Sequence, residues 1–285
     1  MAAPTRAKRR LGSFLAGLRD EAGKSASDAA REIRASDATV SRYESGHVLP
    51  VWPTVRAFLD FYSASAKDRE KAARLWDDAK HEPPPVRLPA GTPKAFRRLV
   101  SAEREAETAL AIELNVVPGL LQTRNYALAL FRAAHRFNET DAQAEGLASS
   151  RLIRQQRLFG PHPPRLHVLL DEAAIQRRVG GAEVMREQLE HLLDVAELPH
   201  ITVQVIPFEA GAYGTMSGSC MIIAYPQPDE TPGVYLEYPA GGSWVDNEED
   251  VRRFTATFDD VAELALSPAD TADLIRRKIR ALTKR

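Results

Sequence analysis

Two short amphipathic patterns, separated by only two residues, constrain how the first part of this chain folds. The first begins at Ser25, a common N-cap residue, and Asp28 follows three positions later as in a capping box. The second begins after Ser36, whose hydroxyl can cap the new helix, and ends at Gly46. Since only residues 34–35 lie between them, the two helices must cross steeply. This geometry predicts a helix-turn-helix that places one helix in a DNA major groove.

The second of these helices carries a specific sequence pattern. Its members are Ser36, Val40, Ser41, Arg42, Tyr43, Glu44, Gly46 and Pro50. The pattern resembles the Xre/Cro-type helix-turn-helix family, and the resemblance implies sequence-specific binding to double-stranded DNA. Two positions depart from the family: Ala26 stands where Gln is usual, and Arg34 stands where the turn usually has Gly.

The predicted DNA-contacting side chains lie around this helix and in the basic segment 1–10, which is interpreted as a flexible arm. Arg42 can donate to guanine O6 and N7 or to a phosphate. Asp37 can accept from cytosine N4, or it serves only as a partner of the helix dipole. Arg9 and Arg10 either contact phosphates or remain solvated. The predicted set is Arg9, Arg10, Ser25, Ser36, Asp37, Ala38, Thr39, Ser41 and Arg42.

The same resemblance implies a structural ion pair. Members of the family commonly pair an Arg late in their first helix with the Glu that follows the recognition helix, and the corresponding residues here are Arg19 and Glu44. Such a pair would lock the first helix against the recognition helix. The alternative is two solvated charges that do not meet.

Length and charge indicate two domains. The chain has 285 residues, more than one domain usually has, and the prolines at 83–85 cannot continue a helix. We therefore expect a DNA-binding domain over 1–82, a proline-rich linker over 83–91 and a regulatory domain over 92–285. Bases outnumber acids between Met1 and Arg56, although the whole chain has a formal net charge of −1. A basic head on an acidic body fits a nucleic-acid-binding protein.

Composition also argues against several classes of protein. No run of the sequence reaches the roughly 18 apolar residues that span a bilayer, so we expect a cytoplasmic protein with no membrane partner. The single cysteine, Cys220, excludes an internal disulfide and is expected to be a small buried residue. The histidines show no metal-ligand spacing, and no metal, cofactor or catalytic residue is predicted.

The sequence beyond residue 92 mixes helical and strand patterns. Helical periodicity runs from Thr92 through Leu110, and the apolar run Ala111–Val117 follows as a predicted strand. Further strands are predicted over 166–170, 201–206, 219–225 and 234–238, and further helices over 141–158, 172–178, 184–198, 248–266 and 268–282. The expected fold class is α+β overall. It combines an N-terminal all-α five-helix Xre-type helix-turn-helix domain with a C-terminal α+β domain that has a small sheet and flanking helices.

Several phrases of this second part carry another resemblance. They are Val117–Thr123, Arg151–Gln155, Leu170–Ala173, Met185–Leu189, Val203–Phe208 and Tyr235–Glu237. Together they resemble the C-terminal domain of actinobacterial Xre-type regulators described as antitoxin-like, which are often encoded beside a small partner protein. The resemblance leads us to expect a regulatory domain that receives a small partner protein or a small-molecule effector.

Candidate partner- or ligand-binding residues in this part are few. Arg151 and Arg154 recur with Arg157 at every third position, which is usual for a solvated, salt-bridged face but also suits a groove for an acidic partner. The glycine-rich run Gly211–Gly218 lacks the Lys-Ser/Thr ending of a phosphate loop and is interpreted as a hairpin loop. The predicted partner- or ligand-binding set is Arg151, Arg154, Phe208 and Tyr213.

Two classes of function remain. The first is a sequence-specific DNA-binding transcriptional regulator, not an enzyme, that binds an inverted-repeat operator as a homodimer. The second is a small-molecule-binding protein or an enzyme with an accessory DNA-binding head, for which Tyr213, Tyr235 and Trp244 are the aromatic candidates. The sequence favours the first, because spacing alone suggests no Ser/His/Asp grouping.

Overall fold

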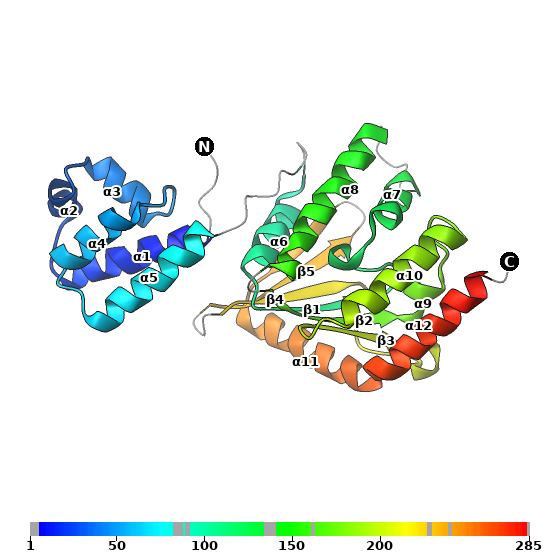
Figure 1. The fold of residues 1–285 in the computed structure, drawn as a ribbon. Helices are drawn as coiled ribbons and strands as arrows, with labels where there is room; N and C mark the ends of the chain where they lie inside the picture. Colours follow the sequence, from blue (N-terminus) through cyan, green and yellow to red (C-terminus); the bar gives the residue numbers. More distant parts are fainter. Residues whose placement is uncertain are drawn as a thin grey trace. The chain divides into compact units, whose positions relative to one another are not determined.

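The computed structural model describes residues 6–81, 88, 92–133, 141–160, 163–226, 230–238 and 241–283. The chain divides into two compact units, Met1–Pro84 and Pro85–Arg285. Figure 1 shows the first as a bundle of helices and the second as a sheet with flanking helices. The division falls within the predicted linker 83–91, of which only Leu88 is among the described residues.

Within residues 6–81, five helices surround one apolar core. They are α1 (Arg6–Glu21), α2 (Ala26–Glu32), α3 (Asp37–Glu44), α4 (Trp52–Phe61) and α5 (Ala66–Lys80). Leu11 and Leu15 of α1, Val40 of α3 and Phe58 of α4 are almost fully buried in this core. The five-helix head predicted from the sequence is confirmed.

The first helix begins earlier than its apolar pattern predicted. Arg9 and Arg10 lie inside α1, so the flexible arm expected over 1–10 is wrong for residues 6–10. Lys and Arg are good helix formers, and a tertiary contact also holds this turn. A Cβ added at Gly46 would lie under 3.0 Å from the backbone of Arg9, so the start of α1 packs directly against the end of α3.

Local capping defines α2 and α3. The Ser25 hydroxyl accepts from the backbone N–H of Asp28, and the Asp28 carboxylate accepts from the backbone N–H of Ser25, which forms the predicted capping box. The Ser36 hydroxyl accepts from the backbone N–H of Thr39 at the start of α3. Between the helices, Arg34 has a φ of 54°, the left-handed conformation that the Gly usual at this position adopts more easily.

The second unit is built on a six-stranded mixed sheet. Its strands are β1 (Thr108–Glu113), β2 (Arg165–Asp171), β3 (Ile201–Ile206), β4 (Cys220–Ala224), β5 (Gly233–Tyr238) and β6 (Gly241–Val245), in the order β3-β2-β1-β4-β5-β6. The pairs β1–β2 and β2–β3 are parallel, whereas β4, β5 and β6 pair antiparallel. The predicted α+β class with a small sheet is confirmed.

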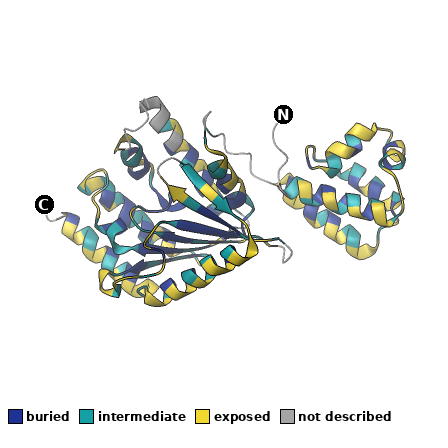
Figure 2. Ribbon diagram, turned by 180° about the vertical axis from the view of Figure 1, so that it is seen from behind, coloured by how far each residue is buried: buried dark blue, intermediate teal, exposed yellow. Residues whose placement is uncertain are grey.

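Helices cover both faces of this sheet. One face packs against α6 (Lys94–Glu105), α10 (Ala182–Ala196) and α12 (Pro268–Thr283), and the other packs against α11 (Glu248–Leu264). The remaining helices are α7 (Arg124–Ala133), α8 (Asp141–Gln155) and α9 (Glu172–Gln176), with short 3-10 turns η1 (Gly119–Leu121), η2 (Gln156–Phe159) and η3 (Phe208–Ala210). Figure 2 shows the strands buried between helices whose outer surfaces are exposed.

One boundary in this unit was predicted wrongly. The helical pattern expected to continue to Leu110 ends with α6 at Glu105, and the strand expected over 111–117 is β1, which occupies Thr108–Glu113. Alanine and leucine in this stretch favour a helix locally. Pairing with β2 on one side and β4 on the other overrides that preference.

Candidate functional site

The exposed surface of α3 is the candidate nucleic-acid interface of the first unit. Val40 is fully buried and anchors the helix in the core. Thr39 is half-buried. The other predicted contact residues on or before this helix are exposed, namely Ser36, Asp37, Ala38, Ser41 and Arg42. A helix anchored on one side and exposed on the other can enter a groove without unfolding.

Two charged side chains on this surface already make contacts within the head. The Ser27 hydroxyl donates to Asp37 Oδ2 at 2.5 Å, so Asp37 ties the start of α3 to α2 as well as complementing the helix dipole. Arg42 Nε donates to the Ala38 carbonyl at 3.1 Å, which leaves the terminal nitrogens of its guanidinium to meet a base or a phosphate.

Arg19 and Glu44 form the ion pair that the family resemblance implied. Arg19 Nε donates to Glu44 Oε1 at 2.7 Å and Nη2 donates to Oε2 at 3.2 Å. The two side chains are only 14% and 16% exposed. The hydrogen bond to Glu44 is the main cause of a raised Arg19 pKa, and burial opposes it. The pair fastens the end of α1 to the end of α3 and so fixes the orientation of the exposed helix.

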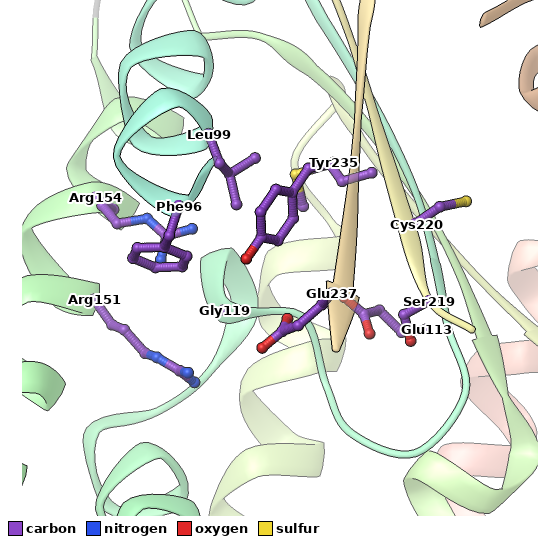
Figure 3. A pocket seen from close by; sticks show the side chains of 11 residues that line it. Phe96, Leu99, Glu113, Gly119, Arg151, Arg154, Ser219, Cys220, Tyr235 and Glu237 are labelled. Carbon is purple, nitrogen blue, oxygen red and sulfur yellow. The ribbon is translucent and has the colours of Figure 1, made fainter. Parts of the chain in front are cut away.

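In the second unit, a concave pocket lies on the sheet face that α6 covers. It includes about 450 Å³ of space, part of which is open to solvent. Helices α6 and α8 contribute apolar and cationic side chains, while β1, β4 and β5 contribute the floor (Figure 3). Its aromatic and polar lining consists of Phe96, Glu113, Arg151, Arg154, Ser219, Tyr235 and Glu237.

Strand register explains how two acids reach this floor together. Cys220 of β4 pairs with the residue just before Glu113 on β1 and with the residue just before Glu237 on β5. Because β4 runs antiparallel to β1 and β5, the neighbouring positions Glu113, Ser219 and Glu237 lie side by side in one row on one face of the sheet. In Figure 3, Glu237 points toward the side of the pocket on which Arg151 lies, whereas Cys220 points away from it.

The charge of Glu237 acts on Glu113, its neighbour in the row. Burial, followed by the nearby charge of Glu237, raises the pKa of Glu113 to about 8. Neither carboxylate forms an ion pair with a cationic side chain among the described residues. Burial, with the Glu113 charge next, also raises the pKa of Cys220 to about 11, so this thiol is no nucleophile at neutral pH.

Arg151 is the cation that faces this row. It donates to Gln122 Oε1, and its guanidinium lies 4.6 Å from the centroid of the Phe131 ring. Burial, then repulsion by Arg154, lowers its pKa to about 10, so it remains charged at neutral pH. No carboxylate among the described residues forms an ion pair with it.

Arg154 has a different environment. Its Nε and Nη2 donate to the two oxygens of Glu103 at 2.8 and 2.5 Å, and the two side chains are only 5% and 4% exposed. The guanidinium also lies 5.1 Å from the centroid of the Phe96 ring. Arg154 therefore borders the pocket with its charge already neutralised, and its geometry is that of a structural pair joining α8 to α6.

Comparison with known protein families accounts for both units. Residues 10–72 match a family described as a helix-turn-helix domain, which implies DNA as a partner of the first unit. Residues 96–277, well over half of the 285-residue chain, match the family described as a domain of unknown function, DUF5753. The chain belongs to the DUF5753 family. No curated protein and no solved structure matches it.

The DUF5753 domain separates the four residues predicted to bind a partner or ligand. Arg151 and Arg154 line the pocket, but Tyr213 packs with the cluster on the opposite face of the sheet and donates to Asp171 Oδ2 at 2.5 Å. Phe208 is 58% exposed in η3. The pocket therefore brings together Arg151 and Arg154 but not Tyr213, which packs on the other face of the sheet.

The glycine-rich run of the DUF5753 domain is not a hairpin loop. It leads from β3 to β4, and β2 and β1 lie between these two strands in the sheet. The prediction assumed that strands adjacent in sequence pair with each other, which holds for β4–β5 and β5–β6 but not here.

Two residues that matter for the pocket were missed by the sequence analysis. Glu113 and Glu237 come from strands far apart in sequence, and only the register through β4 reveals that they share a row. Part of the signal was present, because each acid directly follows an apolar residue of its strand. None of the described helices has the length and apolar character needed to cross a membrane.

Proposed function

We propose that this protein is a sequence-specific DNA-binding transcriptional regulator that reads an inverted-repeat operator as a homodimer. In this account the DUF5753 domain holds two heads together and receives a small partner protein or a small-molecule effector, as in the antitoxin-like member of a gene pair. No catalytic step is part of the proposal. The observation that carries it is α3, capped at its start, anchored by Val40 and exposed along its other side.

The dimer is supported by the size of the head. One short helix of eight residues presents too few side chains to select an operator from a genome, whereas two heads related by two-fold symmetry read paired half-sites. Of the large apolar side chains exposed in the described part of the DUF5753 domain, three lie on two consecutive elements, which suits an association surface. They are Leu152 and Ile153 of α8 and Phe159 of η2.

Arg42→Ala is expected to weaken binding to the operator by about 1–3 kcal/mol and to relax the preference at one base pair, because a guanidinium at this position can donate to a base edge. Arg9→Ala combined with Arg10→Ala should instead weaken binding to all sequences and reduce the salt dependence, because phosphates carry no sequence information. Fluorescence anisotropy with operator and scrambled duplexes, at several salt concentrations, measures both effects.

Arg74→Ala provides the matched control for Arg42→Ala. Arg74 is a comparably exposed arginine of α5 with an intrahelical partner, Glu70, so its loss changes the net charge of the head by the same amount. This control should bind the operator nearly as the natural chain does. A loss on removing Arg42 that is equal for operator and scrambled DNA would assign Arg42 to a phosphate and remove it from sequence readout.

A further inference from the structure

The pocket of the DUF5753 domain contains opposite charges that do not meet. Arg151 stands on one side, where its partners among the described residues are an amide oxygen and an aromatic ring. Glu113 and Glu237 lie in the row of the floor, and each affects the pKa of Arg151 without forming an ion pair with it. Opposite charges that stay apart in a partly enclosed site must be separated by water or by a ligand that pairs with both.

We propose that this pocket binds a small zwitterion of the α-amino-acid type, with its carboxylate on Arg151 and its ammonium group at Glu113 and Glu237. This inference deepens the effector-binding part of the proposed function, because it names the chemical class of the effector.

The geometry matches the two charged groups of such a ligand. A guanidinium donates two parallel hydrogen bonds to a carboxylate, and Arg151 has donors left for them after its bond to Gln122. An ammonium group has three donors and no acceptor, and the floor offers carboxylate oxygens together with the Ser219 hydroxyl. Figure 3 shows the Tyr235 hydroxyl directed into the space between Arg151 and Glu237.

Electrostatics disfavours ligands with only one of the two charges. A plain anion that reached Arg151 would face the negative charge of Glu237, and a plain cation at the floor would face Arg151. A zwitterion satisfies both sides at once. The raised pKa of Glu113 is consistent with this reading, because a neighbouring ammonium group would stabilise its ionised form.

Apolar groups complete the pocket and suggest which part of the ligand they receive. Phe96 and Leu99 of α6 face Tyr235 of β5, and the ring centroids of Phe96 and Tyr235 are 6.3 Å apart. The guanidinium of Arg154 pairs with Glu103 and stacks on the Phe96 ring. It therefore contributes a flat surface to the pocket and does not form a second anion site. An apolar or aromatic amino-acid side chain fits this surface.

The test is calorimetric titration of the full chain with each of the twenty L-α-amino acids up to millimolar concentration. We expect at least one to bind. Its N-acetyl and carboxamide derivatives, which lack one charge each, should bind about tenfold more weakly or worse, because each leaves a charged group of the pocket without a partner. The absence of binding by all twenty, or equal binding of either derivative, overturns the proposal.

Two substitutions locate the binding in the pocket. Arg151→Lys keeps the charge but loses the two-pronged donor, and Glu237→Gln removes one charge from the floor. Each should weaken binding of the selected amino acid at least about tenfold, because the first removes the paired donors to the ligand carboxylate and the second removes a negative charge beside its ammonium group. Arg124→Lys and Glu190→Gln make the same chemical changes at exposed pairs outside the pocket and should leave the affinity unchanged. Unaltered affinity in both pocket variants contradicts the proposal, even if an amino acid binds.

DNA binding provides a separate readout. If the chain binds an operator but no amino acid, only this inference fails. If an amino acid binds with the predicted dependence on Arg151 and Glu237, yet the chain selects no DNA sequence, the inference stands and the proposed function fails.

Discussion

Arg154→Ala is expected to lower the free energy of unfolding of the DUF5753 domain by about 3–5 kcal/mol, the largest loss among the substitutions considered. The reason is the nearly complete burial of the pair that it forms with Glu103. Truncating the arginine leaves a carboxylate without water and without a counter-charge. Glu103→Ala should have a similar effect, since it leaves a buried guanidinium.

The double variant Arg154→Met, Glu103→Leu separates the net contribution of the ion pair to the free energy of unfolding from the cost of burying one unpaired charge. Replacing both partners with apolar residues of similar volume is expected to be far less destabilising than either single truncation, because no buried charge remains. Arg124→Ala is the control, since Arg124 and Glu145 form a pair between α7 and α8 whose side chains are 47% and 40% exposed. This control should change stability by less than about 1 kcal/mol.

Chemical denaturation followed by tryptophan fluorescence can report on this domain alone. Of the three tryptophans, only Trp244 lies in the second unit, so a Trp52→Phe, Trp76→Phe background isolates its transition. Equal, small effects of Arg154→Ala and Arg124→Ala would show that the Arg154 pair is solvated.

Gly12→Ala is expected to destabilise the helix-turn-helix head by about 1–3 kcal/mol, although alanine favours helices. A Cβ at this position would lie under 3.0 Å from the carbonyl oxygens of Tyr43 and Glu44. These are backbone atoms at the end of α3, so α1 and α3 would have to separate. The exposed helix would then lose the orientation that the Arg19 pair gives it.

Gly17→Ala in the same helix is the matched control for Gly12→Ala. Nothing lies within 4 Å of a Cβ built at Gly17, so alanine there should stabilise the head by roughly 0.5–1 kcal/mol through helix propensity. Denaturation in a Trp244→Phe background follows the head through its own tryptophans. Changes of the same sign at both glycines would contradict the close packing of α1 on α3.

The helix-turn-helix could be predicted closely because its signals are local. Ser25 with Asp28, Ser36, and Gly46 mark ends that depend on hydrogen bonds within a few residues. The start of α1 could not be predicted in this way. Residues 6–10 carry no apolar stripe, and only the contact of Arg9 with Gly46 shows that they belong to the packed helix.

The pocket was only half visible in the sequence. Arg151 and Arg154 stood out by their spacing, but nothing in that spacing distinguished a buried structural pair from an unpaired cation. That distinction depends on Glu103, which lies 51 positions away from Arg154. The acidic row depends on strand register between β1, β4 and β5, which hydrophobic alternation does not determine for strands so far apart.

Selection of DNA ligands from a random pool by the full chain measures directly whether the protein reads an inverted-repeat operator. The account predicts enrichment of an inverted repeat with half-sites about one helical turn apart or a multiple of it, bound at least roughly 10³-fold more tightly than random DNA at physiological salt. Enrichment of no sequence, or a monomer in sedimentation that binds a single half-site as tightly as the full repeat, would contradict it.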